Sequence, residues 1–259
     1  MTITRLELAK DTAERTGKLL QRYFQAGNQP GTLKADQTLV TEADRAADQF
    51  IQDRIFQEYP SDQILSEEGS TFFPDGRHVW VIDPLDGTVN FSKGMNHWGI
   101  SIAHLKNGLP QTAVVFFPET SELFSAEKGG GAELNGRRLM LTDDKDNDLF
   151  QIFVHCSRMS QRYRVNLPYK TRSLGSAAYH LCLVSNNTAT LAFESTPKIW
   201  DIAGAWLIVS EAGGVITSLG NNQPFPAKSG VDYQNVSFPT LAAESDDILA
   251  DAREKIIRK

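Results

Sequence analysis

The sequence predicts a mixed α/β (α+β) fold in which helices and sheets form stacked layers. Three observations lead to this class. The first quarter of the chain holds two segments with apolar residues at helical spacing, the middle carries a β-hairpin signal, and the second half alternates strands with helices. Hairpins join antiparallel strands and alternating elements make crossovers, so both kinds of connection are expected.

Two helices are expected at the start of the chain. The first ends at Ala26-Gly27-Asn28, and a polar loop follows to about Thr38. The second opens at Thr41-Glu42-Ala43-Asp44 and ends at Tyr59-Pro60-Ser61. The two apolar stripes are formed by Leu6, Ala9, Ala13, Leu20 and Phe24, and by Ala47, Phe50, Ile51 and Ile55.

A sheet is expected to follow these helices. Asp83-Pro84 is expected to end one of its strands, because proline has no N–H to donate. Asn107-Gly108 predicts a tight hairpin turn, since this pair favours the positive φ angles that such turns need. The expected strands are Ile64-Leu65, His78–Ile82, two strands within Trp98–Phe117, and Glu122–Ala126.

In the second half, strands and helices alternate. The expected strands cover residues 150–155, 190–194, 215–217 and 236–243, and the expected helices cover residues 176–184, 201–211 and 246–258. The polar run over residues 142–148 is read either as a solvated loop or as a boundary between subdomains. The second reading divides the chain into residues 1–145 and 146–259, which together make one unit.

Composition excludes several classes of function. The chain has 259 residues and a net charge of -6, which does not suit a nucleic-acid binder. Its 2 cysteines are too few for a disulfide scaffold. The first residues are charged and amphipathic, and no apolar run reaches the ~20 residues of a membrane span. We therefore expect a cytoplasmic protein without nucleic-acid or membrane partners.

One cluster carries the strongest chemical signal. In Asp83-Pro84-Leu85-Asp86-Gly87-Thr88, two carboxylates lie three residues apart directly after a buried strand. A helix that starts after Gly87 would offer free N–H groups to an anion. A divalent cation between the carboxylates would relieve their repulsion, and oxygen ligands suit Mg²⁺. Spacing alone leaves a plain turn open, because aspartate and glycine are common in turns.

Other acidic residues are candidates to complete such a site. Glu67-Glu68 follows a short apolar element. Asp44 lies in the first turn of a helix and Asp201 opens another, so a helix-dipole contact and an N-cap are their structural alternatives. Glu211 lies at a helix end, where a structural role is expected.

Several segments resemble, in order, the motifs of the inositol monophosphatase family. Together they span about residues 34 to 214. The matching segments are Leu39-Val40-Thr41-Glu42-Ala43-Asp44, Ser66-Glu67-Glu68, Trp80–Phe91, Arg172–Ala178, and Ile199–Ala205 running on to Glu211–Gly214. The resemblance implies a layered αβαβα fold with mixed sheets and a Mg²⁺-dependent, lithium-sensitive phosphomonoesterase, usually a homodimer.

The resemblance also implies a ligand set for two or three Mg²⁺ ions. Glu67, Asp83 and the Leu85 carbonyl would hold the first ion. Asp83, Asp86 and Asp201 would hold the second, and Glu67 would also touch a weaker third ion.

Further roles follow from the same resemblance. Asp44 and Thr88 would orient or deprotonate the attacking water, and the N–H groups of Gly87 and Thr88 would bind phosphate. Glu194 matches the position that contacts a ring hydroxyl in inositol-specific members. The substrate loop would contribute Gly175, Ser176 and Ala177.

The substrate is expected to be a small polyol phosphate, with inositol 1-phosphate first. Lys34-Ala35-Asp36 together with Val40–Asp44 is similar to the histidinol-phosphate branch, which gives the main alternative. Fructose 1,6-bisphosphate is a third ester to compare. A regulatory member that docks to a partner protein is the alternative outside enzymes. His97, His104 and His180 are expected to be structural. For His155 and Arg158, which follow a strand, both a structural position and a position facing the pocket stay open.

Overall fold

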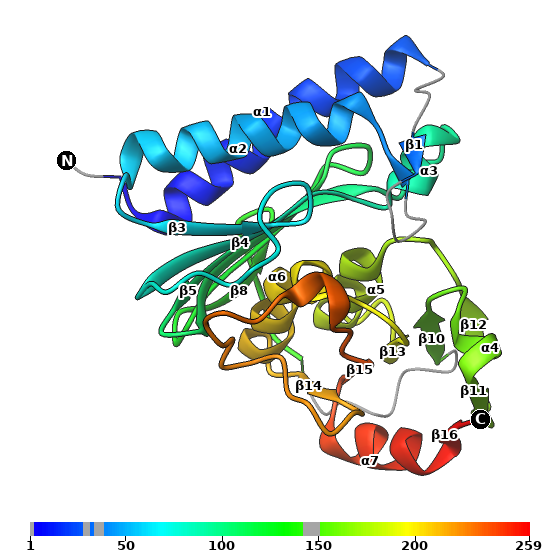
Figure 1. Cartoon of the computed structure of the whole chain (residues 1–259). Coiled ribbons are helices and arrows are strands. Elements are labelled where there is room, and N and C mark those ends of the chain that lie inside the picture. Colours follow the sequence, from blue (N-terminus) through cyan, green and yellow to red (C-terminus); the bar gives the residue numbers. More distant parts are fainter. Residues whose placement is uncertain (1–2, 28–31, 34–38, 142–150) are drawn as a thin grey trace.

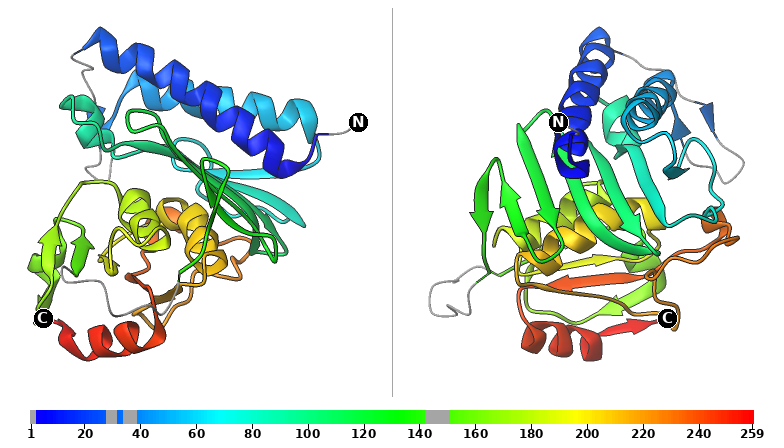
Figure 2. Two further views of the ribbon diagram at one scale, coloured as in Figure 1. Left: turned by 180° about the vertical axis from the view of Figure 1, so that it is seen from behind. Right: turned by 90° about the vertical axis from the view of Figure 1, so that its left-hand side faces the viewer.

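The layers run in the order helix, sheet, helix, sheet, helix (Figure 1). In this computed structural model, which describes residues 3–27, 32–33, 39–141 and 151–259, α1 (Arg5–Ala26) and α2 (Glu42–Glu58) cover one face of the first sheet. The middle layer is α5 (Ala177–Ser185) and α6 (Ile199–Glu211), and α7 (Asp246–Lys255) covers the far sheet (Figure 2). The predicted αβαβα arrangement is confirmed.

The first sheet has seven strands in the order β3-β4-β5-β6-β7-β8-β9. β3 runs parallel to β4, and every other neighbouring pair is antiparallel. The predicted hairpin is confirmed, because Asn107 and Gly108 have φ angles of 53° and 75° between β5 and β6. The bounds are β3 Gln63–Ser66, β4 His78–Asp86, β5 Gly99–Lys106, β6 Leu109–Phe117, β7 Glu122–Glu127, β8 Gly131–Leu134 and β9 Arg137–Leu139.

The second sheet has five strands in the order β12-β10-β13-β15-β14. β10 pairs in parallel with β12 and β13, whereas β15 is antiparallel to both its neighbours, so this sheet is also mixed. Its bounds are β10 Ile152–His155, β12 Lys170–Arg172, β13 Leu191–Glu194, β14 Val215–Ser218 and β15 Thr240–Ala243. The smaller elements are β1 Thr32–Leu33, β2 Leu39–Val40, α3 Thr88–Ser92, α4 Met159–Arg162, β11 Tyr163–Val165, a 3-10 turn Tyr233–Asn235, and β16 Ile256–Arg258.

The middle layer packs very closely on the first sheet. A Cβ atom at Gly204 would lie 2.7 Å from Ser101 Oγ and 2.8 Å from the Val115 side chain. Only glycine lets α6 approach β5 and β6 this closely. This contact brings the start of α6 toward the edge where β3 and β4 end.

Three sequence expectations are wrong in detail. The strand at His78 does not end before Pro84 but runs to Asp86, because a bulge between Asp83 and Asp86 removes the need for a proline N–H. The expected strand over 236–243 is shorter and covers Thr240–Ala243. The last helix ends at Lys255, since residues 256–258 pair with β11 instead.

Other expectations fall outside the described residues. They are most of the polar loop before Thr38, the boundary at residue 145, and Lys34-Ala35-Asp36. The division into 1–145 and 146–259 therefore stays a prediction. In the part of the chain that the structure describes, no helix combines the length and the apolar character needed to cross a membrane.

Candidate active site

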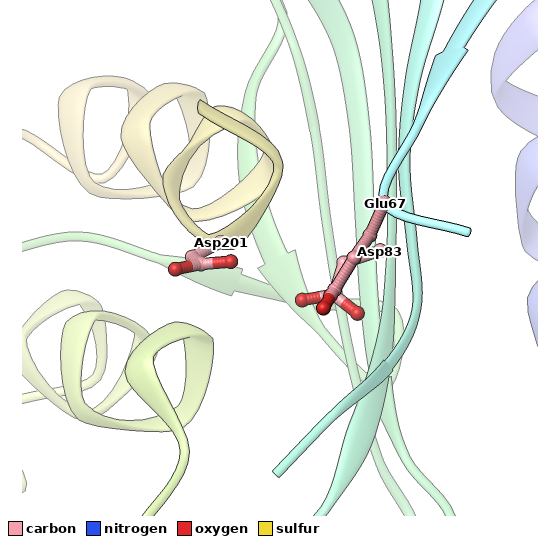
Figure 3. Close-up of side chains that lie close together, drawn as sticks. All are labelled: Glu67, Asp83 and Asp201. Carbon is pink, nitrogen blue, oxygen red and sulfur yellow. The ribbon is translucent and has the colours of Figure 1, made fainter. Parts of the chain in front are cut away.

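Three carboxylates from distant parts of the sequence meet at one place (Figure 3). Glu67 follows β3, Asp83 lies near the end of β4, and Asp201 lies in the first turn of α6. One oxygen of each lies within 4.8 Å of the others. Parallel strands place their carboxyl ends at the same edge, which explains why Glu67 and Asp83 meet.

The end of β4 is shaped by the bulge and by Gly87. Asp83 accepts a hydrogen bond from the Leu85 N–H at 3.1 Å, and the pairing resumes between Asp86 and Gly99. Gly87 has φ 86°, and a Cβ there would lie 2.8 Å from the His97 carbonyl oxygen. This position therefore requires glycine, and the chain turns directly into α3.

Asp86 lies outside the group of three and faces the start of α5. It accepts hydrogen bonds from the Ser176 hydroxyl and from the N–H groups of Ala177 and Ala178, at 3.2 and 3.0 Å. Two residues expected in the substrate loop, Ser176 and Ala177, thus fix this carboxylate in place. Asp86 still interacts electrostatically with Asp83 and Asp201.

Asp44 both caps a helix and lies beside Thr88, so its structural and its functional alternative hold together. As third residue of α2 it accepts a hydrogen bond from the Thr41 N–H at 2.7 Å, which caps the helix. Its other oxygen lies 3.1 Å from the Thr88 hydroxyl, which also lies 3.1 Å from the Leu85 carbonyl oxygen. The capping contact thus holds Asp44 beside the start of α3.

Asp201 is not the N-cap of α6, as the sequence suggested. The helix begins at Ile199, and Asp201 is its third residue, where one carboxylate oxygen accepts the Lys198 N–H at 2.8 Å. The helix begins earlier because this carboxylate reaches back to the preceding backbone. The side chain is thereby held at the helix end that faces Asp83 (Figure 3).

A cavity of about 220 Å³ adjoins these acids. Gly175 at φ 83° passes so close to Asn90 that a Cβ would lie 2.6 Å from its side-chain oxygen. Asn90 donates to the carbonyls of His97 and Leu174, each at 2.6 Å, and so fixes the loop. Residues expected at the site that line the cavity are Asp86, Arg158, Gly175, Ser176, Ala177, Glu194 and Asp201. His155 is not among the residues described as lining it.

His180 was expected to be structural, but it lines the cavity. Its Nε2 accepts the Leu174 N–H at 2.8 Å, so the proton lies on Nδ1, which donates to Glu194 Oε1 at 2.6 Å. Both side chains are buried and both residues line the cavity. The sequence did hold an indication of this position. His180 is three residues after Ala177, a spacing that puts both residues on the same side of α5.

The electrostatics of the acidic cluster favour a cation. Burial, with the repulsion of Glu67, Asp86 and Asp201, raises the pKa of Asp83 well above its ordinary value. Burial and the charge of Glu67 raise the pKa of Asp201 in the same way. Burial raises the pKa of Asp86 to about 6, despite the hydrogen bonds from Ser176 and Ala178 that lower it. Burial also raises the pKa of Asp44. Buried carboxylate oxygens whose charges repel one another fit a hard divalent cation such as Mg²⁺.

Comparisons with known proteins agree with this geometry. An Inositol-1-monophosphatase from Rhizobium meliloti (strain 1021) is 36% identical over 228 residues, which cover 83% of this chain and 86% of the relative. A protein named Nus factor SuhB from Escherichia coli (strain K12) is 32% identical over 96% of this chain and 98% of its own length. A Thermotoga maritima IMPase superposes with a TM-score of 0.78 at 27% identity, covering 97% of this chain and 98% of the other.

The sequence model of the inositol monophosphatase family covers nearly all of these elements. It matches residues 4–257, from the start of α1 to β16. Together with relatives that align over most of their length, this match shows that the chain belongs to the inositol monophosphatase family.

Proposed function

We propose that the protein is a Mg²⁺-dependent phosphatase that hydrolyses the phosphate monoester of a small polyol, with inositol 1-phosphate as the first substrate to test. The observation that carries the proposal is the meeting of Glu67, Asp83 and Asp201 beside a cavity. The Rhizobium meliloti relative, named Inositol-1-monophosphatase, supports the choice of ester.

The acidic residues would hold the metal. Glu67, Asp83 and the Leu85 carbonyl form one set, and Asp83, Asp86 and Asp201 form a second that shares Asp83. Glu67 would also contact a third ion. When bound, Mg²⁺ offsets charge on the phosphoryl oxygens, lowers the pKa of water at the site and stabilises the leaving alkoxide.

The chain's own residues would position the attacking water and the phosphate. The Thr88 hydroxyl, between Asp44 and the Leu85 carbonyl, orients the water. Asp44 takes up its proton, and the raised pKa of this buried carboxyl suits a base. The N–H groups of Gly87 and Thr88, at the turn into α3, would bind the phosphate.

The cavity would accept the polyol. The Glu194 carboxylate accepts a hydrogen bond from His180 at Oε1. Its Oε2 accepts no side-chain hydrogen bond from the residues that the structure describes, so it can accept one from a ring hydroxyl. Gly175, Ser176 and Ala177 also line this cavity. Since the His180 ring is fixed by Leu174, Glu194 needs little reordering when substrate binds.

A panel of phosphate esters tests this function. Phosphate release from inositol 1-phosphate, histidinol phosphate and fructose 1,6-bisphosphate is measured in saturating Mg²⁺ and in excess chelator. We expect the highest kcat/KM with inositol 1-phosphate and no turnover in chelator. Asp86→Asn should lower kcat by orders of magnitude with an unchanged fold. Full activity in chelator would refute the proposal.

The Escherichia coli relative named Nus factor SuhB favours a second, regulatory role through a partner protein. This role becomes the main one if the purified protein turns over none of the esters. Lithium inhibition, a homodimer and a cytoplasmic location complete the proposal as properties typical of the family.

A further inference from the structure

A second and larger cavity lies away from the acidic cluster. Its volume is about 420 Å³, and it opens between the β11–β16 ribbon, the segment that follows β14, and the end of β13. Segments distant in sequence thus meet beside the C-terminal strand, and Figure 1 shows β11 and β16 side by side at this end of the molecule. The proposed phosphatase reaction uses none of these residues.

The ribbon sorts its side chains onto two faces. Tyr163 pairs with Arg258 and Arg164 pairs with Ile257, so each pair shares one face and the two pairs point opposite ways. Tyr163 and Arg258 line the cavity, whereas Ile257 is 57% exposed on the other face. Tyr163 packs edge-on against Phe193 with the ring centres 4.9 Å apart, which anchors the ribbon to β13.

The cavity is lined by cations without acidic partners. Arg162, Arg258 and Lys259 line it, and none of the other described residues lining it is an aspartate or glutamate. Lys259 donates its Nζ to the Ser160 carbonyl at 2.5 Å. Neither arginine forms an ion pair with any residue the structure describes. Such a concentration of positive charge is unexpected in a chain of net charge -6.

Polar groups complete the lining. Asn221, Asn222 and Ser237 add amide and hydroxyl groups, which bind phosphate oxygens well. The guanidinium group matches two oxygens of a phosphate with parallel hydrogen bonds. The lining therefore suits a tetrahedral oxyanion rather than an apolar or cationic molecule.

The two cavities lie along one segment of chain. Glu194 and Thr196 line the cavity beside the acidic cluster, and Ser195 between them lines the basic cavity. The Ser195 hydroxyl lies 3.0 Å from Cys156 Sγ, and Cys156 belongs to the first cavity. An anion in the basic cavity would thus contact the segment that carries Glu194.

We propose that the basic cavity is a binding site for a phosphate group, separate from the acidic cluster. Arg162, which precedes β11, and Arg258 on β16 lie at the same end of the ribbon and contact the phosphate oxygens from the two strands. The anion is inorganic phosphate or the phosphate of an ester, which share this chemistry. Phosphate binding at this site does not require turnover. A protein that fails to bind phosphate here can therefore be distinguished from one that fails to hydrolyse the esters.

Calorimetric titration of the full chain with inorganic phosphate tests the site, in excess chelator and in Mg²⁺. In chelator the acidic cluster repels phosphate, so the binding that remains reports the basic cavity. Arg162→Ala and Arg258→Ala should each weaken it by about tenfold, since each removes a charge-assisted contact. Arg164→Ala is the matched control, because it removes the same exposed charge from the opposite face.

The result expected is therefore a loss in two variants and none in the control. A repeat with inositol 1-phosphate in chelator separates the sources: tighter binding of the ester identifies a substrate phosphate, and tighter binding of inorganic phosphate identifies the reaction product. No binding in chelator would overturn the proposal. So would equal losses in all three variants, or binding that neither cavity variant changes. Thermal unfolding of each variant checks that the fold is intact.

Discussion

Mg²⁺ should stabilise the protein more strongly as pH rises. The perturbation is a pH increase in chelator, which ionises a buried carboxyl cluster that has no cation to offset its charge. The pKa of Asp86 is raised from its ordinary value of 3.8 to about 6, and the pKa values of Asp83 and Asp201 are raised well above their ordinary values. In each case burial is the largest cause.

The sign and size of this effect follow from linkage. A carboxyl whose pKa is raised by folding favours the folded state fully below pH 3.8, and that contribution is lost as pH rises through about 6. Folding raises the pKa of Asp86 by about 2, and each unit of pKa corresponds to roughly 1.4 kcal/mol. The free energy of unfolding is therefore about 3 kcal/mol lower at pH 8 than at a pH where Asp86 is protonated in both states. The ionisation of Asp83 and Asp201 lowers the stability of the metal-free protein in the same direction.

The assay is thermal unfolding with and without Mg²⁺ between pH 4 and pH 8, a range that contains both the unfolded and the folded pKa of Asp86. For a chain of this size about 3 kcal/mol corresponds to roughly 6–12 °C in Tm. The gain in Tm on adding Mg²⁺ should grow by about this amount across the range. Burial lowers the pKa of His104 to about 3, so the stability that neutral His104 contributes is lost as pH falls below 6.5. This loss is the same with and without Mg²⁺ and therefore cancels in the difference between the two Tm values.

Two variants sharpen the test. Asp86→Asn removes the ionisation, so the metal-free variant should lose less stability toward pH 8 than the parent. Asp75→Asn removes an exposed carboxyl instead and should behave like the parent. If Mg²⁺ raised Tm equally at pH 4 and pH 8, the buried carboxyls would not be the source of the effect.

Three further outcomes are expected. Thr88→Ala should lower kcat by about a hundredfold with little change in KM, whereas Thr88→Ser, which keeps the hydroxyl, should retain most of the activity. Equal kcat values for the two variants would show that the hydroxyl takes no part in catalysis. Asp48 accepts hydrogen bonds from the Ser66 hydroxyl and, at 2.7 Å, from Gln52. Because Ser66 directly precedes Glu67, this contact should position the Glu67 carboxylate, and Asp48→Asn should raise the Mg²⁺ concentration for half-maximal activity about tenfold without changing kcat at saturation. An unchanged Mg²⁺ requirement would show that the contact does not position Glu67. Gly204→Ala should lower the free energy of unfolding in urea by about 1–3 kcal/mol, because its Cβ would lie 2.7 Å from Ser101 Oγ, whereas Gly220→Ala meets nothing closer than 3.6 Å and should be neutral.

The parts of the fold set by local sequence could be predicted. The hairpin follows from Asn107-Gly108, whose positive φ angles are a property of those two residues. The start of α2 follows from Thr41 and Asp44, which cap each other within one turn. Elements set by distant pairing could not be predicted. β16 exists because residues 256–258 meet β11, about 90 residues earlier in the chain.

For the candidate site too, some features could be predicted from the sequence and others depend on tertiary structure. The motif resemblance selected Glu67, Asp83 and Asp201 as ligands, whereas their spacing left turns and caps open. Their meeting depends on the parallel pairing of β3 with β4 and on the close approach of α6, which are tertiary features. His180 was missed because α5 is apolar along most of its length, and the Leu174 N–H that orients the ring comes from the preceding loop.

The most direct test of the account is a crystal soaked with Mn²⁺ and phosphate, with Mn²⁺ located by its anomalous scattering. We expect ions at about 2.1 Å from carboxylate oxygens of Glu67, Asp83 and Asp201, with phosphate on the side of Thr88. Mn²⁺ bound only elsewhere on the protein, with this acidic cluster empty at saturating concentration, would contradict it.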